Sequence, residues 1–173
     1  GAPLDPALKA EAERALGQPL HNGYGLTETS PTISLSRIEA PRADLSVGPP
    51  VPGIELRFVG ADGRAVPGGE VGELHVRGPN VMLGYLRFEN PGVLERPPEG
   101  WYDTGDIVTI DAQGFIKIQG RAKRFAKVGG EMISFAAVEA IAGDLWPDAI
   151  SAVVAVPDAR KGERLLLYTN NKN

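Results

Sequence analysis

Residues 100–130 read GWYDTGDIVTIDAQGFIKIQGRAKRFAKVGG, and two sequence textures meet within this stretch. Its first half predicts two short strands, at 107–110 and 115–118, on either side of the turn Asp111-Ala-Gln-Gly114. From Gly120 onward the sequence becomes basic and ends in two glycines. We therefore expect a β-rich region to end near residue 120 and a different region to begin there.

The β-rich region extends back to Ser46, with further strands predicted at 54–59 and 71–76. Within it, the run Glu73-Leu74-His75-Val76-Arg77 alternates loosely between polar and apolar residues. Each strand is therefore expected to bury one face only. The pattern predicts a small distorted β-barrel or sheet over residues 46–120.

Residues 1–45 predict one helix at 5–17, followed by a brief strand at 19–21 and a glycine-rich turn at 22–25. Asp5 is the expected N-cap, Pro6 the first helical residue and Gly17 the C-cap. The expected apolar stripe of this helix consists of Leu8, Ala12 and Leu16.

Residues 121–173 predict a strand at 125–128, a helix at 134–142, and strands at 150–156 and 165–169. Ser134 is a suitable N-cap, and Gly143 is the expected end of the helix. The predicted class is therefore α+β, with a distorted β-barrel subdomain followed by a small α+β domain.

Composition excludes several functions. The formal net charge of -4 and pI near 5.3 give no reason to expect a nucleic-acid partner, although the basic run at 121–127 suits one polyanionic small molecule such as a nucleotide. Without cysteine there is no disulfide or thiolate chemistry, and two histidines are too few for a histidine-rich metal cage. No apolar run reaches the roughly 20 residues of a membrane-spanning helix. We expect a cytoplasmic protein, with membrane contact peripheral or through regions outside this chain, for example at the inner membrane face.

Three polar clusters contain residues that could bind a ligand or take part in catalysis. In Gly23-Tyr-Gly-Leu-Thr-Glu-Thr-Ser30, the glycines allow close backbone approach, and a hydroxyl and a carboxylate could meet a phosphate and its magnesium. In Gly100-Trp-Tyr-Asp-Thr-Gly-Asp106, the last carboxylate could accept both hydroxyls of a ribose. The third is the basic run at 120–130. Their structural alternatives are, respectively, a turn with an N-capping threonine, a β-turn stabilised by aspartate, and a solvated connector.

The three clusters together, in this order, resemble the motifs of the adenylate-forming superfamily, which includes acyl-CoA synthetases, luciferases and peptide-synthetase adenylation domains. The resemblance covers almost the whole chain and implies that the chain is the carboxyl-terminal portion of such an enzyme. Its parts would be the end of a large AMP-binding domain at 1–45, a barrel-like subdomain at 46–120, and a partial mobile domain at 121–173. The stretches at 80–86, 91–94, 101–108 and 114–127 are most similar to bacterial bifunctional acyltransferase/acyl-acyl carrier protein synthetases. A departure that favours this subfamily is Ser134-Phe-Ala-Ala-Val-Glu139, where acyl-CoA synthetases have Pro-x-Glu-Ile-Glu.

The resemblance implies a fatty acid and ATP as substrates, with acyl carrier protein or coenzyme A as the thiol acceptor and Mg²⁺ as cofactor. Glu28 would bind Mg²⁺ and Thr27 the α-phosphate, while Asp106 would hold the ribose of ATP or AMP with Arg121 beside it. The adenine would be lined by Tyr24, Gly25 and the segment Gly1, Ala2 and Pro3.

The resemblance also makes Lys123 the hinge between two catalytic conformations. Lys127, Gly129 and Gly130 would then border a tunnel for the phosphopantetheine arm, although a surface strand lysine is the simpler interpretation of Lys127.

The family's phosphate-binding loop and acyl pocket would precede Gly1, and its adenylation lysine would follow Asn173. Lys172 lacks the sequence context of that lysine and is not assigned the role. The chain alone is therefore expected to be inactive. Two alternatives remain: a fragment of an acyl-CoA or aryl-CoA ligase, and a non-catalytic module that docks a carrier protein.

Overall fold

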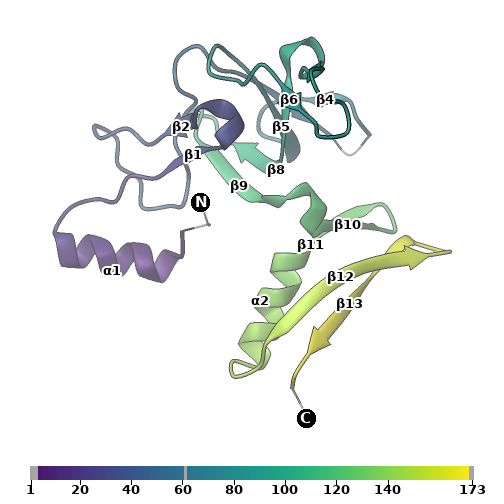
Figure 1. Ribbon diagram of the computed structural model, residues 1–173. Helices are drawn as coiled ribbons and strands as arrows, with labels where there is room; N and C mark the ends of the chain where they lie inside the picture. Colours follow the sequence, from purple (N-terminus) through teal and green to yellow (C-terminus); the bar gives the residue numbers. More distant parts are fainter. Residues whose placement is uncertain (1–3, 61, 172–173) are drawn as a thin grey trace. The chain divides into compact units, whose positions relative to one another are not determined.

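The computed structural model describes residues 4–60 and 62–171, and the chain divides into two compact units, Gly1–Gln119 (unit 1) and Gly120–Asn173 (unit 2). Each unit is described by itself below, with the element labels of Figure 1. The elements of unit 1 are α1 (Pro6–Leu16), β1 (Gly23–Gly25), η1 (Thr27–Thr29), β2 (Thr32–Leu35), β3 (Glu55–Val59), β4 (Ala65–Val66), β5 (Gly72–Arg77), β6 (Tyr85–Leu86), β7 (Leu94–Glu95), η2 (Pro98–Gly100), β8 (Tyr102–Ile110) and β9 (Ile116–Arg121), the last of which runs across the unit boundary. Those of unit 2 are η3 (Ala122–Arg124), β10 (Phe125–Val128), β11 (Glu131–Ser134), α2 (Phe135–Leu145), β12 (Ser151–Asp158) and β13 (Gly162–Thr169).

Helix α1 begins and ends where its capping residues predict. The Asp5 carboxylate accepts a hydrogen bond from the Leu8 backbone nitrogen at 2.9 Å, and Gly17 ends the helix in the left-handed conformation. The predicted apolar stripe, however, is wrong as a buried face, because Leu8 and Leu16 are 56% and 67% exposed. Lys9 is buried instead, since its ammonium group binds both Glu13 and the Arg42 carbonyl oxygen. Local caps therefore set the bounds of α1, while ion pairing sets its orientation.

A five-stranded sheet with the order β4-β3-β5-β8-β9 organises unit 1. The α+β class is confirmed, but the described strands form an open sheet rather than a closed barrel, with β4 and β9 as its edges. Strand β4 has two residues and pairs with β3 alone, so it offers little backbone for closing the sheet. The predicted strand at 19–21 is wrong: the first strand is β1, which pairs antiparallel with β2.

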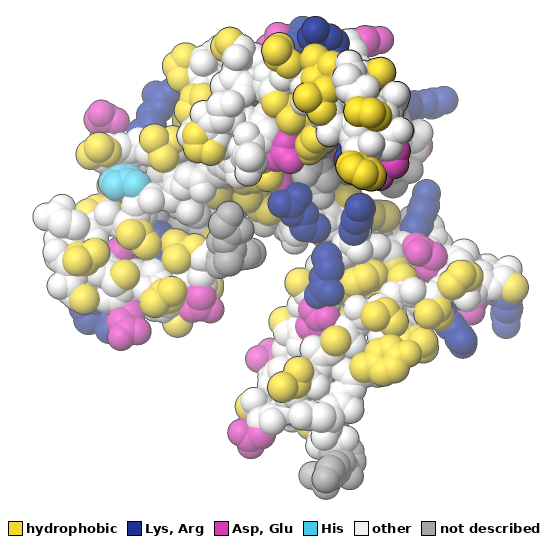
Figure 2. Space-filling model, viewed as in Figure 1, with side chains coloured by type: hydrophobic (Ala, Val, Ile, Leu, Met, Phe, Trp, Pro, Cys, Tyr) yellow, Lys and Arg dark blue, Asp and Glu magenta, His cyan; other side chains and the backbone are white. Residues whose placement is uncertain are grey.

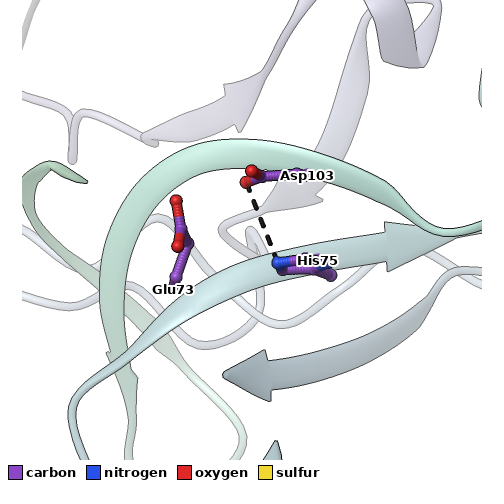
Figure 3. A group of neighbouring side chains, drawn as sticks. All are labelled: Glu73, His75 and Asp103. Carbon is purple, nitrogen blue, oxygen red and sulfur yellow. Dashed lines mark ion pairs between the residues drawn. The ribbon is translucent and has the colours of Figure 1, made fainter. Parts of the chain in front are cut away.

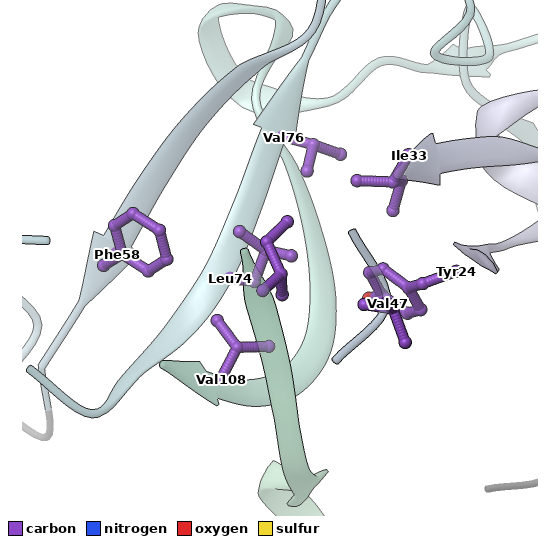
Figure 4. Packing of buried hydrophobic residues seen from close by; sticks show 8 residues of the cluster. Tyr24, Ile33, Val47, Phe58, Leu74, Val76 and Val108 are labelled. Carbon is purple, nitrogen blue, oxygen red and sulfur yellow. The ribbon is translucent and has the colours of Figure 1, made fainter. Parts of the chain in front are cut away.

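The core of unit 1 lies where β1, β2, β3, β5 and β8 meet (Figure 4). Ile33, Leu74, Val76 and Val108 are fully buried there. Strand β5 alternates strictly between buried and half-buried positions, as the polar and apolar alternation of its sequence predicts. Leu74 and Val76 thus face the core, while Glu73, His75 and Arg77 lie on the opposite face.

Unit 2 is a four-stranded sheet with the order β11-β10-β13-β12, and α2 packs along β12 (Figure 1). Ser134 caps α2, as expected, through a hydrogen bond of 3.4 Å from the Ala137 backbone nitrogen. The expected end at Gly143 is wrong, because α2 continues to Leu145. Ala142, next to Gly143, is only 3% exposed. Its packing outweighs the loss of helix stability, about 1 kcal/mol, that a glycine inside a helix causes.

Large hydrophobic side chains also reach the surface of both units (Figure 2). Phe88 is 95% exposed in unit 1, and Ile150 is 77% exposed in unit 2. Among the residues that the structure describes, no helix is long and apolar enough to cross a membrane.

Candidate active site

Two of the predicted motifs meet through one buried hydrogen bond. The Tyr24 hydroxyl donates to Asp106 Oδ2 at 2.5 Å, joining residues 82 positions apart in the sequence. Tyr24 is 9% exposed and Asp106 is 3% exposed. The tyrosine-glycine turn and the carboxylate at the end of Thr104-Gly105-Asp106 are therefore parts of one site.

An irregularity in β8 turns Asp106 toward Tyr24. Glu73 of β5 pairs with Ile107 and His75 pairs with Asp103, so three residues of β8, Thr104 to Asp106, lie opposite Leu74 alone. Gly105 adopts a φ of 66°, which favours glycine, at the centre of this bulge. The Thr104 hydroxyl secures it by donating to the Leu74 carbonyl oxygen at 2.7 Å and accepting from the Asp106 backbone nitrogen at 3.1 Å.

The loop that carries Thr27 and Glu28 is held rigidly. A Cβ atom on Gly25 would lie 1.6 Å from the Pro31 carbonyl oxygen, so only glycine fits at this position. Thr29 is buried, and its hydroxyl lies within hydrogen-bond distance of the carbonyl oxygens of Leu26 and Pro31. The Asn80 amide donates to the carbonyl oxygens of Thr29 and Thr32, both at 2.7 Å. Asn80 and Thr29 are thus site residues that the sequence reasoning missed.

Glu28 is half-buried and accepts a hydrogen bond from the Tyr85 hydroxyl at 2.6 Å. Tyr85 in turn lies 3.2 Å from the Tyr102 hydroxyl. The hydrogen bond to Glu28, followed by the contact with Tyr102, raises the pKa of Tyr85 above its usual value because the phenol is held in its protonated form. Thr27, beside Glu28, is exposed.

This arrangement fits the magnesium ion that the family resemblance implies. Mg²⁺ is usually bound through one or two carboxylates together with substrate phosphates. The half-buried carboxylate of Glu28, oriented by Tyr85 next to the exposed hydroxyl of Thr27, is a donor of that kind.

The remaining predicted residues lie in or next to unit 2. Arg121 ends β9, and Lys123 lies in the 3-10 turn η3 directly after it. Lys127 is an exposed residue of β10 whose backbone nitrogen donates to Glu163 Oε2 at 2.6 Å. Gly129 and Gly130 form the two-residue turn between β10 and β11, with φ of 61° and 98°. Gly1, Ala2 and Pro3 lie outside the described residues.

Comparison with known proteins gives a consistent result. The sequence profile of the family described as AMP-binding enzyme matches residues 1–86. A long-chain-fatty-acid–CoA ligase of Yersinia pestis is 36% identical over 169 residues, which are 97% of this chain and 30% of that protein. The chain thus spans about a third of the length of such relatives.

Solved structures agree with the sequence match. ATP-bound MatB from Rhodopseudomonas palustris has a TM-score of 0.76 at 32% identity, covering 98% of this chain and 34% of that one. The o-succinylbenzoate CoA synthetase MenE from Bacillus subtilis, solved with its acyl-adenylate intermediate, has a TM-score of 0.75 at 31% identity, with 98% and 34% covered. Motifs, fold and relatives agree, and the chain belongs to the AMP-binding, adenylate-forming enzyme family.

Proposed function

We propose that this chain is the carboxyl-terminal part of an ATP-dependent acid–thiol ligase that forms an acyl adenylate. In the first step a carboxylate attacks the α-phosphate of ATP, giving acyl-AMP and pyrophosphate. In the second step a thiol attacks the acyl carbon and releases AMP. Negative charge develops at the α-phosphate in the first step and at the acyl oxygen in the second, so fixed donors and a cation would lower both barriers.

The observation that supports this proposal best is the bond between Tyr24 and Asp106. It joins the two motifs that would hold the adenosine part of ATP and buries their contact. By occupying Oδ2, the Tyr24 hydroxyl fixes the orientation of the Asp106 carboxylate toward the ribose. A carboxylate held in one orientation loses less entropy when it accepts the ribose hydroxyls.

The other roles follow from position. Glu28 would hold Mg²⁺, which would offset the negative charge of the phosphates, with Tyr85 as its positioning residue, and Thr27 would bind the α-phosphate. Tyr24, Gly25 and the segment Gly1, Ala2 and Pro3 would line the adenine, and Arg121 would lie beside the ribose.

The boundary of the two units near residue 120 supports a hinge. We place the rotation between the two half-reactions at Lys123, in the short turn that follows β9. In the second conformation Lys127, Gly129 and Gly130 would border the thiol. A Cβ atom added to either glycine would have no other atom within 4 Å, so this exposed turn is open to solvent.

For the substrates, we propose a fatty acid as the carboxylate and coenzyme A as the thiol. The Yersinia pestis relative is named as a long-chain-fatty-acid–CoA ligase, and MenE is named as a CoA synthetase. The acyl carrier protein acceptor expected from subfamily resemblance has no counterpart in these names. Competition between coenzyme A and a carrier protein as acceptors, measured with the intact enzyme, distinguishes the two.

Binding of AMP to the 173-residue chain tests the nucleotide site directly. Saturation-transfer NMR should show contacts to the adenine and ribose protons, and Asp106→Asn should abolish those at the ribose. Asparagine can still accept the Tyr24 hydrogen bond, so the local fold is retained. Asp103→Asn, on the same strand but exposed, is the matched control. An unchanged ribose signal in Asp106→Asn would sink the assignment.

Catalysis is expected to require more chain than these 173 residues, which span about a third of the relatives. With ATP, Mg²⁺ and a long-chain fatty acid, no pyrophosphate exchange is expected from the chain alone. Measurable exchange would show that the residues above are sufficient for adenylation.

A further inference from the structure

Three side chains capable of binding a metal converge on the outer face of the sheet of unit 1 (Figure 3). Glu73, His75 and Asp103 each place one ligand atom within 4.8 Å of the others. His75 Nε2 lies 3.9 Å from Asp103 Oδ1. None of the three has a role in the nucleotide site described above, although Asp103 lies within one of the family motifs.

Strand pairing holds the three residues together. Glu73 and His75 are two positions apart on β5 and so share one face, while His75 pairs directly with Asp103 on β8. The β8 bulge sends Asp106 to the core and leaves Asp103 on the outer face. Because all three lie on paired strands, their backbones are fixed before any ligand arrives, which lowers the entropic cost of binding.

The local charges favour a cation. The carboxylates of Glu73 and Asp103 lie within 4.8 Å of each other in this cluster, so a cation bound between them would offset their mutual repulsion. The His75 imidazole offers a nitrogen donor beside these two carboxylates.

The nearest arginines are engaged elsewhere. Arg57, which pairs with His75 across β3 and β5, stacks on the Trp101 ring at 4.5 Å. Arg77 stacks on the same ring at 4.6 Å and pairs with Glu55. Within the described residues, no ion pair joins either arginine to Glu73 or Asp103. Neither arginine therefore forms an ion pair with the two carboxylates, although Arg57 lines the same cavity as His75 and Asp103.

We propose that Glu73, His75 and Asp103 bind one divalent transition-metal ion, with Zn²⁺ as the ion best suited to the ligands. One imidazole nitrogen and two carboxylate oxygens are common zinc donors, and three protein ligands leave a fourth position for water. Mg²⁺ and Ca²⁺ prefer oxygen donors throughout, so the imidazole favours zinc over both. Small side-chain movements bring the ligand atoms to bonding distance.

An approach route for the ion exists. His75 and Asp103 border a cavity of about 450 Å³ that Tyr85, Trp101 and Tyr102 also line. The Asp103 side chain is 55% exposed and the His75 side chain 19% exposed. The site is thus accessible at one ligand and sheltered at another, and it shares no ligand with the Mg²⁺ proposed at Glu28.

The composition of the chain makes the test unusually direct. There is no cysteine to compete for zinc, and His21 is the only other histidine. Zn²⁺ titrated into the metal-free 173-residue chain is expected to bind with a stoichiometry of one by calorimetry. In ¹⁵N NMR spectra of the two imidazoles, the His75 signals should shift and those of His21 should not.

Variants locate the site. His75→Asn and Asp103→Asn should each weaken Zn²⁺ binding by at least about 10-fold, the lower end of the losses seen when even outer-shell partners of a metal are removed. His21→Asn is the matched control and should bind as the unaltered chain does. Circular dichroism verifies folding, and Asp103→Asn, at an exposed position, keeps the test valid if His75→Asn unfolds. The proposal is overturned if both variants of the cluster bind Zn²⁺ normally, if the His21 signals shift instead, or if no binding is detected.

Discussion

Units 1 and 2 use different means to hold a sheet together. The core cluster of unit 1 contains eight buried residues drawn from six strands and a connecting loop, whereas that of unit 2 contains three, Ala126, Phe135 and Val153. In unit 2, Ile141 and Leu145 of α2 are 61% and 65% exposed. Because burial of apolar surface is the main stabilising contribution, unit 2 should depend more on hydrogen bonds and caps, and should unfold first. Trp101 lies in unit 1 and Trp146 in unit 2, so the fluorescence of each tryptophan reports on one unit.

The largest effect is expected when a buried side chain in the larger core, that of unit 1, is shortened. Leu74→Ala, at a fully buried position, should lower the free energy of unfolding of unit 1 by about 4 kcal/mol, because it loses buried surface and leaves a cavity. Val153→Ala in unit 2 removes less volume and should cost about 2 kcal/mol. Urea titrations followed by tryptophan fluorescence, with Trp146→Phe to isolate unit 1 and Trp101→Phe to isolate unit 2, measure both. A loss below about 2 kcal/mol for Leu74→Ala would contradict its place in a well-packed core.

Removing one hydroxyl from the candidate site should have an intermediate effect. Tyr24→Phe deletes the donor to the buried Asp106 carboxylate and should destabilise unit 1 by about 2 kcal/mol. Tyr168→Phe in unit 2, where the tyrosine is 60% exposed, is the control and should change little. Both are measured by the same urea titrations. A neutral Tyr24→Phe would show that the hydrogen bond adds nothing to stability.

The N-cap residue of α2, Ser134, offers a test of the stability of unit 2. Ser134→Ala removes the side-chain oxygen that accepts from the Ala137 backbone nitrogen and should lower the free energy of unfolding of unit 2 by about 1 kcal/mol. The Trp146 signal should follow the loss while the Trp101 signal stays unchanged. A shift in both signals would mean that the units unfold as one.

The smallest expected effect is on the pH dependence of unit 1. Although burial alone would raise the pKa of Asp44, hydrogen bonds from Ser46, Lys117 and Arg42 lower it well below the ordinary value of 3.8. A carboxyl whose pKa is depressed on folding contributes stability above its unfolded pKa and loses it as the pH falls toward the folded one. The stability of unit 1 should therefore decline below about pH 4.

Asp44→Asn should flatten that decline. Thermal melts of the two proteins at a series of acidic pH values measure the difference, which should vanish as acid protonates Asp44. The effect is small because the side chain is 30% exposed and water screens its ion pairs. Parallel pH profiles would show that Asp44 is not the group responsible.

Local signals in the sequence predicted the elements that local interactions define. The caps Asp5 and Gly17 set the bounds of α1, and strands β3, β5, β8, β9, β10, β12 and β13 were all expected near their observed positions. Several strands of two to four residues, among them β4, β6 and β11, were missed because they carry too few residues for a periodic pattern, although β10, also of four residues, was expected. The exposed face of α1 was missed because orientation depends on Lys9 reaching Arg42, far away in the sequence.

The candidate site divides in the same way. Motif resemblance selected Tyr24, Glu28 and Asp106, whose roles in catalysis stay predictions. The stretch 80–86 was noted for its resemblance alone, and nothing in it assigned Tyr85 to Glu28 or Asn80 to the carbonyl oxygen of Thr29. The proposed zinc ligands show most clearly where local sequence patterns stop being informative. Alternation along β5 predicts that Glu73 and His75 share a face, whereas the position of Asp103 depends on how β8 pairs across its bulge.

That bulge has a consequence for how the protein can change. It adds two residues to β8 relative to β5, an even number, so inward and outward positions stay in phase on both sides of it. Loss of a single residue there would exchange the two faces of the strand and expose Val108. Loss of two would leave the sheet in register and delete the carboxylate pocket. The two extra residues can therefore be gained or lost together without changing the surrounding sheet. The Asp106 pocket can thus appear or disappear while the fold stays the same.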